Sequence, residues 1–498
     1  MAISTAVDSS AVARVVGIKT TFKDRRNGGI LLLPQRLAVI GQGSTAATYD
    51  TTQRQVTSRT EAAQLYGYGS PIHLAVAQLF PINGDGVGTI PVTVYPLEDA
   101  VTATAAVGTI ETTVNATESA AYTVTVGGVT SAAYSILTPD TATTAAAKMA
   151  DAINGVLAMP ATAEAALGVV TLTSKWAGES ANDITLSVSG STTSGNTFAI
   201  TQPTGGTVNP DISAATAQVG DVWETMVLNT LNIDDTTALD VLQTFGDGRW
   251  GALTKKPLVA FTGNTATTVN DATTISDARK TDKVNVQLVA PGSPELPLTV
   301  AARQLARIAA VANNDPARDY GSQDATGLTP GADGVQWTYV DRDVAVKKGS
   351  STVEVKDGVI NLSDTVTFYH PSGDPIPAYR YVCDIVKLQN IIYNINLIFA
   401  AQEWNGAPLI PDDQPTVNRT AKKPKMAIAA AASMVDSLGL NALISDPATA
   451  KKLIQAQISD QNPKRLDMVI PLQLSGNSNI ISVDLDFGFY FGTSAIVN

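Results

Sequence analysis

Histidine, cysteine and paired carboxylates are the side chains with which this chain could do chemistry, and they are few and isolated. The two histidines are His73 and His370. His73 falls in a predicted helix, and His370 precedes Pro371 at the end of a predicted strand. Neither lies in a nucleophile elbow or another context typical of a Ser-His-Asp site. We therefore interpret both histidines as structural.

The sequence also gives little support for a metal site or a phosphate-binding site. Cys383 is the only cysteine, and it lies far in sequence from both histidines, so no transition-metal spacing is present. The pairs Asp412-Asp413 and Asp315/Asp319 lack the spacing of a calcium loop. Residues 41–45, Gly-Gln-Gly-Ser-Thr, follow a predicted strand but lack the lysine and the glycine spacing of a phosphate loop. The sequence predicts a turn there, and no catalytic residue, metal or cofactor.

Composition narrows the class of protein further. The chain has 498 residues, of which 16% are charged, and a net charge of -12. An acidic chain argues against a nucleic-acid binder, which needs a basic stripe facing the phosphates. A single cysteine fits a reducing cytoplasm, and residues 1–10 show no secretory signal. The most apolar run, 391–401, carries two asparagines, so we expect no membrane insertion.

The elements that must position any functional surface include two alternating strands near the end of the chain, within residues 465–491. A period of two with one apolar face predicts strands on a half-buried sheet, joined by a turn at 476–479. The second strand would be a sheet edge, with Asp484 and Asp486 on its outward face. It either pairs inside its own domain or is offered to a neighbouring subunit. The alternating apolar residues are Leu466, Met468, Ile470, Leu472 and Leu474, then Ile481, Val483, Leu485, Phe487, Phe489 and Phe491.

Strands and helices alternate through residues 34–100 and 211–375, which we predict to form one discontinuous α/β core with a partly parallel sheet. Short apolar runs predict the strands, and capping signals or apolar spacing predict the helices. The predicted strands are 37–40, 90–95, 258–261 and 284–289, and a β-rich stretch follows at 337–369. The predicted helices are 58–66, 71–80, 219–231 and 300–312.

Residues 101–210 differ from the core in composition. They contain nine charged residues, which is about half the density of the whole chain. Alternating residues before Gly127-Gly128 predict a hairpin, an Ala-rich run predicts a helix at 141–157, and further strands are expected at 169–173 and 184–188. We interpret this segment as an inserted, outward-facing β-rich domain.

The two ends of the chain form separate predicted parts. Residues 1–33 read as an extended arm in which Val12, Val16 and Ile18 are spaced like strand residues. Residues 376–498 form a C-terminal domain with a helix of about six turns over 381–399, a helix-rich stretch at 426–458 and the terminal hairpin.

Several segments together resemble the contractile tail sheath proteins of Mu-like bacteriophages. The similarity spans about residues 14–491, and it departs from the family at Ser363-Asp364, where many sheaths carry a basic residue. The segments that carry it are 33–43 with 65–70, 314–318, and 338–352 with 357–360 and 366–369.

The resemblance implies a multidomain sheath fold of mixed α/β class and a structural rather than enzymatic function. Such subunits form stacked, hexameric rings around a tail tube, meet baseplate and tail terminator proteins, and contract to drive the tube through the host envelope. The protein would be assembled in the host cytoplasm and located in the virion tail. Strands donated by neighbours complete the C-terminal domain, and the donating residues would be Val12, Val16 and Ile18 with Ile481, Val483, Leu485, Phe487 and Phe489.

A basic stretch stands out in the acidic chain: Arg419, Lys422, Lys423 and Lys425 have no acid between Pro415 and Lys425. It is either a solvated loop or a surface that docks onto an acidic tube. Lys451 and Lys452 form the alternative patch.

Two other classes of protein remain as alternatives. A secreted adhesin or surface-layer protein would share the acidic, Thr/Ala/Gly-rich and cysteine-poor composition, but the missing signal and the long predicted helix at 379–404 disfavour it. An α/β hydrolase is disfavoured because no catalytic constellation is visible.

Overall fold

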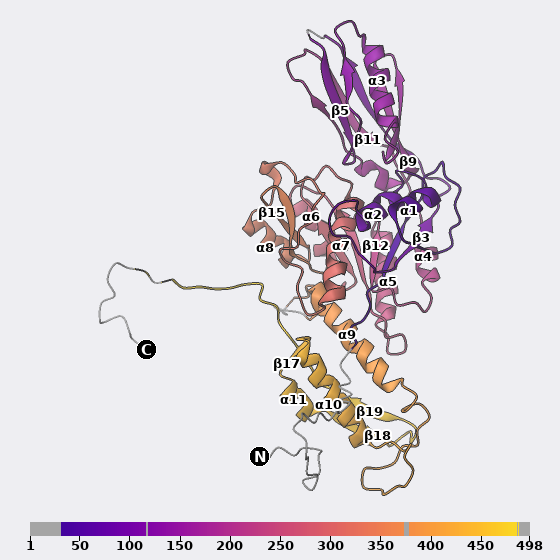
Figure 1. The fold of residues 1–498 in the computed structure, drawn as a ribbon, viewed down its shortest axis with the longest axis vertical. Helices are drawn as coiled ribbons and strands as arrows, with labels where there is room; N and C mark the ends of the chain where they lie inside the picture. Colours follow the sequence, from indigo (N-terminus) through magenta and orange to yellow (C-terminus); the bar gives the residue numbers. More distant parts are fainter. Residues whose placement is uncertain (1–30, 116–117, 373–377, 486, 488–498) are drawn as a thin grey trace, which may run out of the picture. The chain divides into compact units, whose positions relative to one another are not determined.

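The computed structural model describes residues 31–115, 118–372, 378–485 and 487. Contacts divide these residues into two compact units: residues 32–396 together with the segment that begins at Leu474, and residues 397–473. The predicted mixed α/β class is confirmed, with helices and several sheets present (Figure 1).

A six-stranded sheet forms the centre of the larger unit, in the order β14-β13-β12-β1-β3-β2. Its first five strands are parallel, and β2 at the edge is antiparallel to β3. Strands β1, β3 and β13 are buried along their whole length, as expected when helices cover both faces. The strands are β1 (Leu37–Gln42), β2 (Arg54–Val56), β3 (Val92–Leu97), β12 (Met226–Asn229), β13 (Val259–Asn264) and β14 (Asn285–Val289).

Side chains alternate between two cores, one on each face of this sheet. On one face Val39, Leu228 and Phe261 pack with α2 and α7. On the other, Ile40 and Ala260 pack with α4 and α5. The helices of the larger unit's core are α1 (Arg59–Tyr66), α2 (Pro71–Leu79), α4 (Ser213–Gln218), α5 (Thr236–Arg249), α6 (Val269–Ala278) and α7 (Pro297–Asn314).

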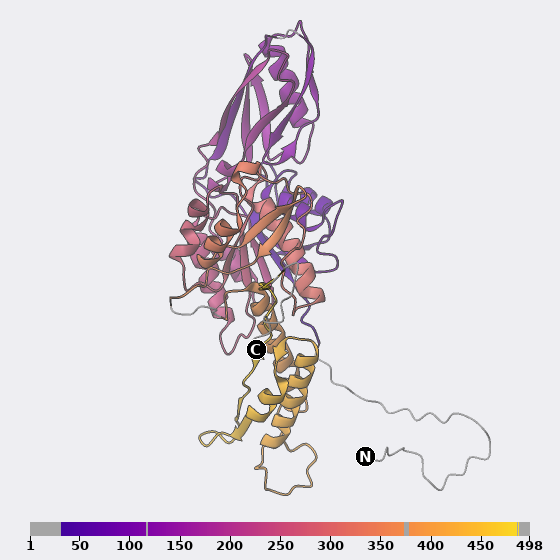
Figure 2. The same ribbon diagram turned by 90° about the vertical axis from the view of Figure 1, so that its left-hand side faces the viewer.

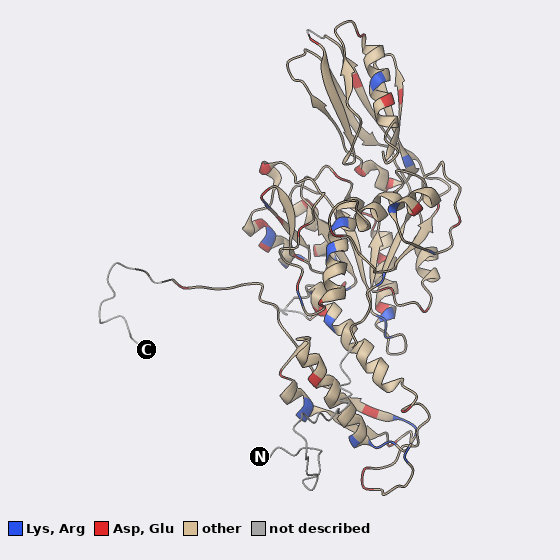
Figure 3. Cartoon of the chain, viewed as in Figure 1, with Lys and Arg blue, Asp and Glu red and all other residues tan. Residues whose placement is uncertain are grey.

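Residues 105–204 fold as two antiparallel sheets with one helix, at one end of the larger unit (Figures 1 and 2). The Gly127-Gly128 hairpin joins β5 to β6, and both glycines have positive φ, as this tight turn requires. Charged residues are sparse here (Figure 3). The sheets are β11-β4-β9-β8 and β10-β5-β6 with β7, and the elements are β4 (Ala105–Thr113), β5 (Ala120–Val126), β6 (Val129–Thr130), β7 (Tyr134–Ile136), α3 (Ala142–Asn154), β8 (Ala161–Ala166), β9 (Val169–Ala177), η1 (Glu179–Asp183), β10 (Leu186–Gly190) and β11 (Thr197–Thr204).

The smaller unit is helical with short strands. Helix α10 (Pro424–Leu440) packs against α11 (Pro447–Leu453) and against β18 (Gln455–Ile458). Its other strands are β17 (Ile444–Ser445) and β19 (Leu466–Val469), and β20 (Gln473–Leu474) lies at the boundary between the units. Helix α9 (Val382–Phe399) belongs to the larger unit up to Asn396, and it matches the predicted long helix.

The predicted helix at 219–231 is wrong. Helix α4 ends before it, and 226–229 is the buried strand β12. A central parallel strand is apolar on both faces, so its short run cannot be told from a buried helix by periodicity. The sequence also offered no prediction for α5.

The predicted β-rich stretch at 337–369 is only partly right. It contains the strands β15 (Thr352–Lys356) and β16 (Val359–Asp364), but its first element is a helix, α8 (Tyr339–Lys347). The short 3-10 helix η2 (Asp333–Val335) lies just before the stretch. A capping box explains the helix, because the Thr338 hydroxyl accepts from the Asp341 N–H while the Asp341 carboxylate accepts from the Thr338 N–H.

The predicted terminal hairpin does not form within the described residues. Strand β19 pairs with β18 in antiparallel register, and residues 475–485 form no strand. The strand β18 is short and polar in alternate positions, so its pairing with β19 was not visible in the sequence. The final predicted strand therefore has no partner within the described residues.

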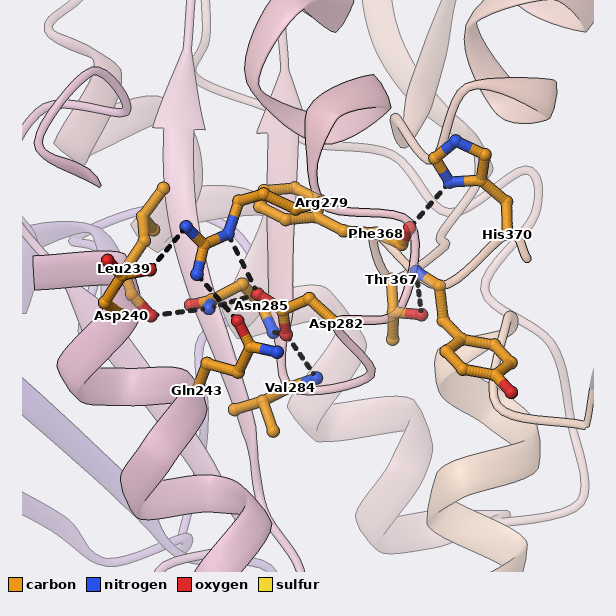
Figure 4. A network of polar contacts seen from close by, with 11 residues as sticks. Leu239, Asp240, Gln243, Arg279, Asp282, Val284, Asn285, Thr367, Phe368 and His370 are labelled. Carbon is orange, nitrogen blue, oxygen red and sulfur yellow. Dashed lines mark hydrogen bonds and ion pairs between the residues drawn. The ribbon is translucent and has the colours of Figure 1, made fainter. Parts of the chain in front are cut away.

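Arg279 ties α5 to the start of β14 (Figure 4). Its guanidinium donates to Asp240, Gln243 and Asp282 at 2.7, 2.8 and 3.2 Å. The Asp282 carboxylate also accepts from the backbone N–H groups of Val284 and Asn285. The network closes the edge of the sheet, since the Phe368 N–H donates to the Asn285 carbonyl at 3.0 Å.

We expect Arg279→Leu to lower the free energy of unfolding by about 3 kcal/mol, because the Asp282 side chain is only 1% exposed and would lose its cation. Urea melts measure this loss. The neighbouring Lys280→Leu is the control: its ion pair with Asp277 is half exposed, so the change should stay within about 1 kcal/mol. Equal effects of the two substitutions would contradict a structural role for the network.

Candidate intersubunit site

The last described segment carries a row of exposed apolar side chains. Ile481, Val483, Leu485 and Phe487 are 78%, 77%, 75% and 85% exposed, and they alternate with Ser482 and Asp484. Water-exposed residues of this size in a strand pattern are costly unless another surface covers them. The segment therefore has the residue pattern of a strand, although it forms no strand here.

The small sheet β18–β19 is a candidate acceptor for an added strand. The cross-strand neighbours Ala456 and Met468, and Ile458 and Leu466, share one half-buried face, and β18 packs against α10. Within the described residues no further strand pairs with either β18 or β19. Two-stranded sheets are marginal alone, and an added strand supplies backbone hydrogen bonds.

The other predicted donor residues cannot be placed. Val12, Val16, Ile18 and Phe489 lie outside the described residues, so their predicted role in strand donation stays a prediction.

Two lysines of the predicted basic patch make contacts within the chain, and the other two basic residues are exposed. The Lys422 ammonium lies 4.9 Å from the Trp404 ring centre and 3.6 Å from the Glu403 carboxylate, and its side chain is 11% exposed. Lys423 donates to the carbonyl of Asp412 at 3.2 Å. Both lysines are thus used to pack the loop that precedes α10.

Arg419 and Lys425 are exposed residues of the same stretch. The Lys425 ammonium reaches the Asp412 carbonyl at 3.4 Å. In the alternative patch, Lys451 forms an ion pair with Asp436 at 2.5 Å, while Lys452 is exposed. These positions leave Arg419, Lys425 and Lys452 as the accessible cations.

The residues with catalytic potential serve the fold. His73 accepts from the Gly69 N–H at 3.0 Å, and burial lowers the pKa of His73 to about 4, so the ring is neutral at pH 7. The His370 ring donates to the Phe368 carbonyl at 2.6 Å (Figure 4).

The backbone N–H groups of the glycine loop at 41–45 donate hydrogen bonds to other residues of the chain. The N–H groups of Gly43, Ser44 and Thr45 donate to the Tyr49 hydroxyl and to the carbonyls of Tyr66 and Lys175. These are the groups with which a phosphate loop would hold its ligand.

The described parts of the chain hold neither a cluster of metal-ligating side chains nor a membrane-spanning helix. Nowhere in those ranges do three or more His, Cys, Asp or Glu side chains gather as metal ligands would. None of the helices there combines the length and hydropathy needed to span a bilayer.

Comparison with known proteins decides between the classes. The chain is 27% identical, over 350 residues, to the Mu-like prophage FluMu tail sheath protein of Haemophilus influenzae. The alignment covers 68% of this chain and 69% of that protein. The chain is homologous to a Mu-like tail sheath protein. The resemblance to contractile tail sheath proteins is thereby confirmed.

Sheath proteins are also among the similar solved structures. Those of Desulfitobacterium hafniense and Listeria innocua are each 12% identical, with TM-scores of 0.46 and 0.47, and the matches cover 89% and 90% of this chain and 93% and 94% of those chains. The contracted helical sheath of the anti-feeding prophage matches with a TM-score of 0.44 at 11% identity, over 96% of this chain and all of that one. No protein-family model matches the sequence.

One buried residue of this region was not predicted from the sequence. Lys387 is fully buried on α9, and it contacts the segment that leads to the exposed apolar row at 481–487. The one signal was a lysine between Val386 and Leu388 in an otherwise apolar stretch of the predicted helix.

Proposed function

We propose that this chain is the structural subunit of a contractile tail sheath and that it polymerises by strand donation. The observation that carries the proposal is the exposed alternating row Ile481, Val483, Leu485 and Phe487, which pairs with no strand in the described residues. Homology to a Mu-like tail sheath protein supports it. A strand added to the edge of β18 or β19 of another subunit would cover the apolar row and satisfy both backbones.

The finer features follow from the same proposal. Subunits would form hexameric rings, stacked helically around a tail tube protein and bounded by baseplate and tail terminator proteins. The arm at 1–33 would supply a second donated strand, and residues 101–210 would face outward. Contraction would rotate the rigid units while the donated strands keep neighbours connected. The virion tail, assembled in the host cytoplasm, is the corresponding location.

Electron microscopy of the purified full chain tests this function. Tubes or stacked rings would support the sheath, and uniformly monomeric particles at high concentration would contradict it.

We expect deletion of residues 2–18 to leave a folded chain that forms no tubes. Only intersubunit backbone hydrogen bonds would be lost, so the thermal melt should stay within a few degrees of that of the full chain. Light scattering and microscopy report assembly, and normal tubes from the shortened chain would show that the arm is not donated.

Arg419 and Lys425 are the residues of the basic patch to substitute, because Lys422 and Lys423 pack within the chain. We expect the double substitution Arg419→Glu and Lys425→Glu to weaken binding of sheath to tube at least tenfold at physiological salt, while empty sheath still polymerises. Lys422→Glu is a different variant, because it breaks the packing on Trp404 and should lower stability. Normal decoration of tubes by the double variant would direct attention to Lys452.

A further inference from the structure

Lys387 is a buried cation whose partners come from two distant parts of the chain. Its side chain is 0% exposed, and its ammonium lies 2.9 Å from the Asp384 carboxylate, one turn earlier on α9. The other two partners are the Ser475 carbonyl at 2.7 Å and the Asn477 side-chain oxygen at 2.6 Å. An ammonium has three N–H donors, and each of them is matched by an acceptor.

Asn477 is held on its other side as well. Its side-chain N–H group donates to the Ala317 carbonyl at 2.9 Å, and its oxygen lies 3.6 Å from the Cys383 sulfur. Both directions of the amide are therefore satisfied by the body of the larger unit. Two residues later, Asn479 donates its backbone N–H to the Asn477 carbonyl at 3.0 Å, and the exposed row starts after it.

We propose that Lys387 clamps residues 475–479 to the larger unit and so fixes the point from which the strand beyond Asn479 is donated. The inference rests on the proposed function, because a fixed origin matters only if the strand is donated. If residues 475–479 left the site, Lys387 would lose two of its three acceptors and keep only Asp384, so the closed arrangement is favoured.

The clamp has a mechanical consequence. Force carried by the donated strand would enter the larger unit through α9, rather than through residues 397–473, which precede the connector in the chain. The strand would then move with the unit that contains the six-stranded sheet.

The only cysteine of the chain reports whether the clamp is closed. Cys383 is 2% exposed and lies beneath Asn477. Burial, with Asp319 and Asp384 nearby, raises the pKa of the Cys383 thiol, and the thiolate is the reactive form. Reaction with a disulfide reagent such as DTNB in native buffer should therefore be slow while the clamp is closed.

We expect Lys387→Met and Asn477→Leu each to accelerate this reaction at least tenfold. Asn477→Leu keeps the test valid if Lys387→Met fails to fold, because residue 477 lies on the half-buried connector. The matched control is Lys451→Met, which removes an ion-paired lysine from α11 and should leave the rate unchanged. A chain that ends at Leu474 is the positive control and should react fastest.

Two outcomes separate the clamp from strand donation. A chain that ends at Asn479 keeps every clamp contact, so its cysteine should react as slowly as that of the full chain while it forms no tubes. Normal polymerisation of that chain would defeat the proposed function and leave the clamp intact. Reaction of the Asn477→Leu cysteine at the rate of the full chain would overturn the clamp itself.

Discussion

A chain that ends at Asn479 will stay unassembled at concentrations at which the full chain forms tubes. Removal of residues 480–498 deletes the exposed row and leaves the contacts between Lys387 and residues 475–477 in place. Burial of four side chains of this size, with the backbone bonds of a new strand, would contribute several kcal/mol per subunit. We therefore expect the critical concentration for assembly to rise more than a hundredfold, as measured by sedimentation and microscopy.

Point substitutions separate the two faces of the donated strand. Val483→Asp with Leu485→Asp should reproduce the truncation, because a charge would enter an apolar interface. Ser482→Asp is the matched control on the opposite face and should assemble within a factor of a few of the full chain. Assembly of the double variant at the normal concentration would show that this row is not the joint.

Gly263→Ala is expected to have the largest effect of any single methyl group on stability. A Cβ at this position of β13 would lie 1.7 Å from the Pro297 carbonyl oxygen, where α7 begins against the sheet. Both groups are backbone, so neither can give way by changing a rotamer. We expect a loss of about 3 kcal/mol in the free energy of unfolding, measured by urea melts.

The chain offers a matched glycine for comparison. Gly248, near the end of helix α5, has no atom within 4 Å of an added Cβ. Gly248→Ala should raise stability by about 0.5 kcal/mol, because alanine loses less conformational entropy in a helix. Similar effects at the two positions would contradict the close approach of α7 to β13.

Local signals in the sequence were sufficient where local chemistry decides the structure. The hairpin at Gly127-Gly128, the N-cap Ser58 of α1 and the Ala-rich helix α3 appear at their predicted places. Each depends on residues within one or two turns of one another, and so it can be read without knowing the fold.

The features that were not predicted from the sequence depend on contacts between residues far apart in the chain. The pairing of β19 with β18 and the clamp between Lys387 and Asn477 join segments whose proximity no local pattern encodes. The basic stretch looked free in sequence, yet Lys422 stacks on Trp404, which lies eighteen positions earlier. Apolar spacing predicts a helix where strand β12 lies, because the apolar run of β12 faces both cores of a buried sheet.

For the exposed row at 481–487, the sequence predicted the alternating pattern and the structure added the exposure of the side chains. Its period of two was visible in the sequence, but both pairing within the domain and donation to a neighbour were open. The structure describes residues 480–485 and 487 without a strand and with their apolar side chains in water. That observation favours donation.

A cryo-electron microscopy map of tubes assembled from the full chain tests strand donation most directly. The account predicts that residues 481–487 form a strand hydrogen-bonded to β18 or β19 of a different subunit, with Val483 and Leu485 covered by that subunit. Tubes in which residues 481–487 pair only with their own chain, or lie unpaired on the surface, would contradict it.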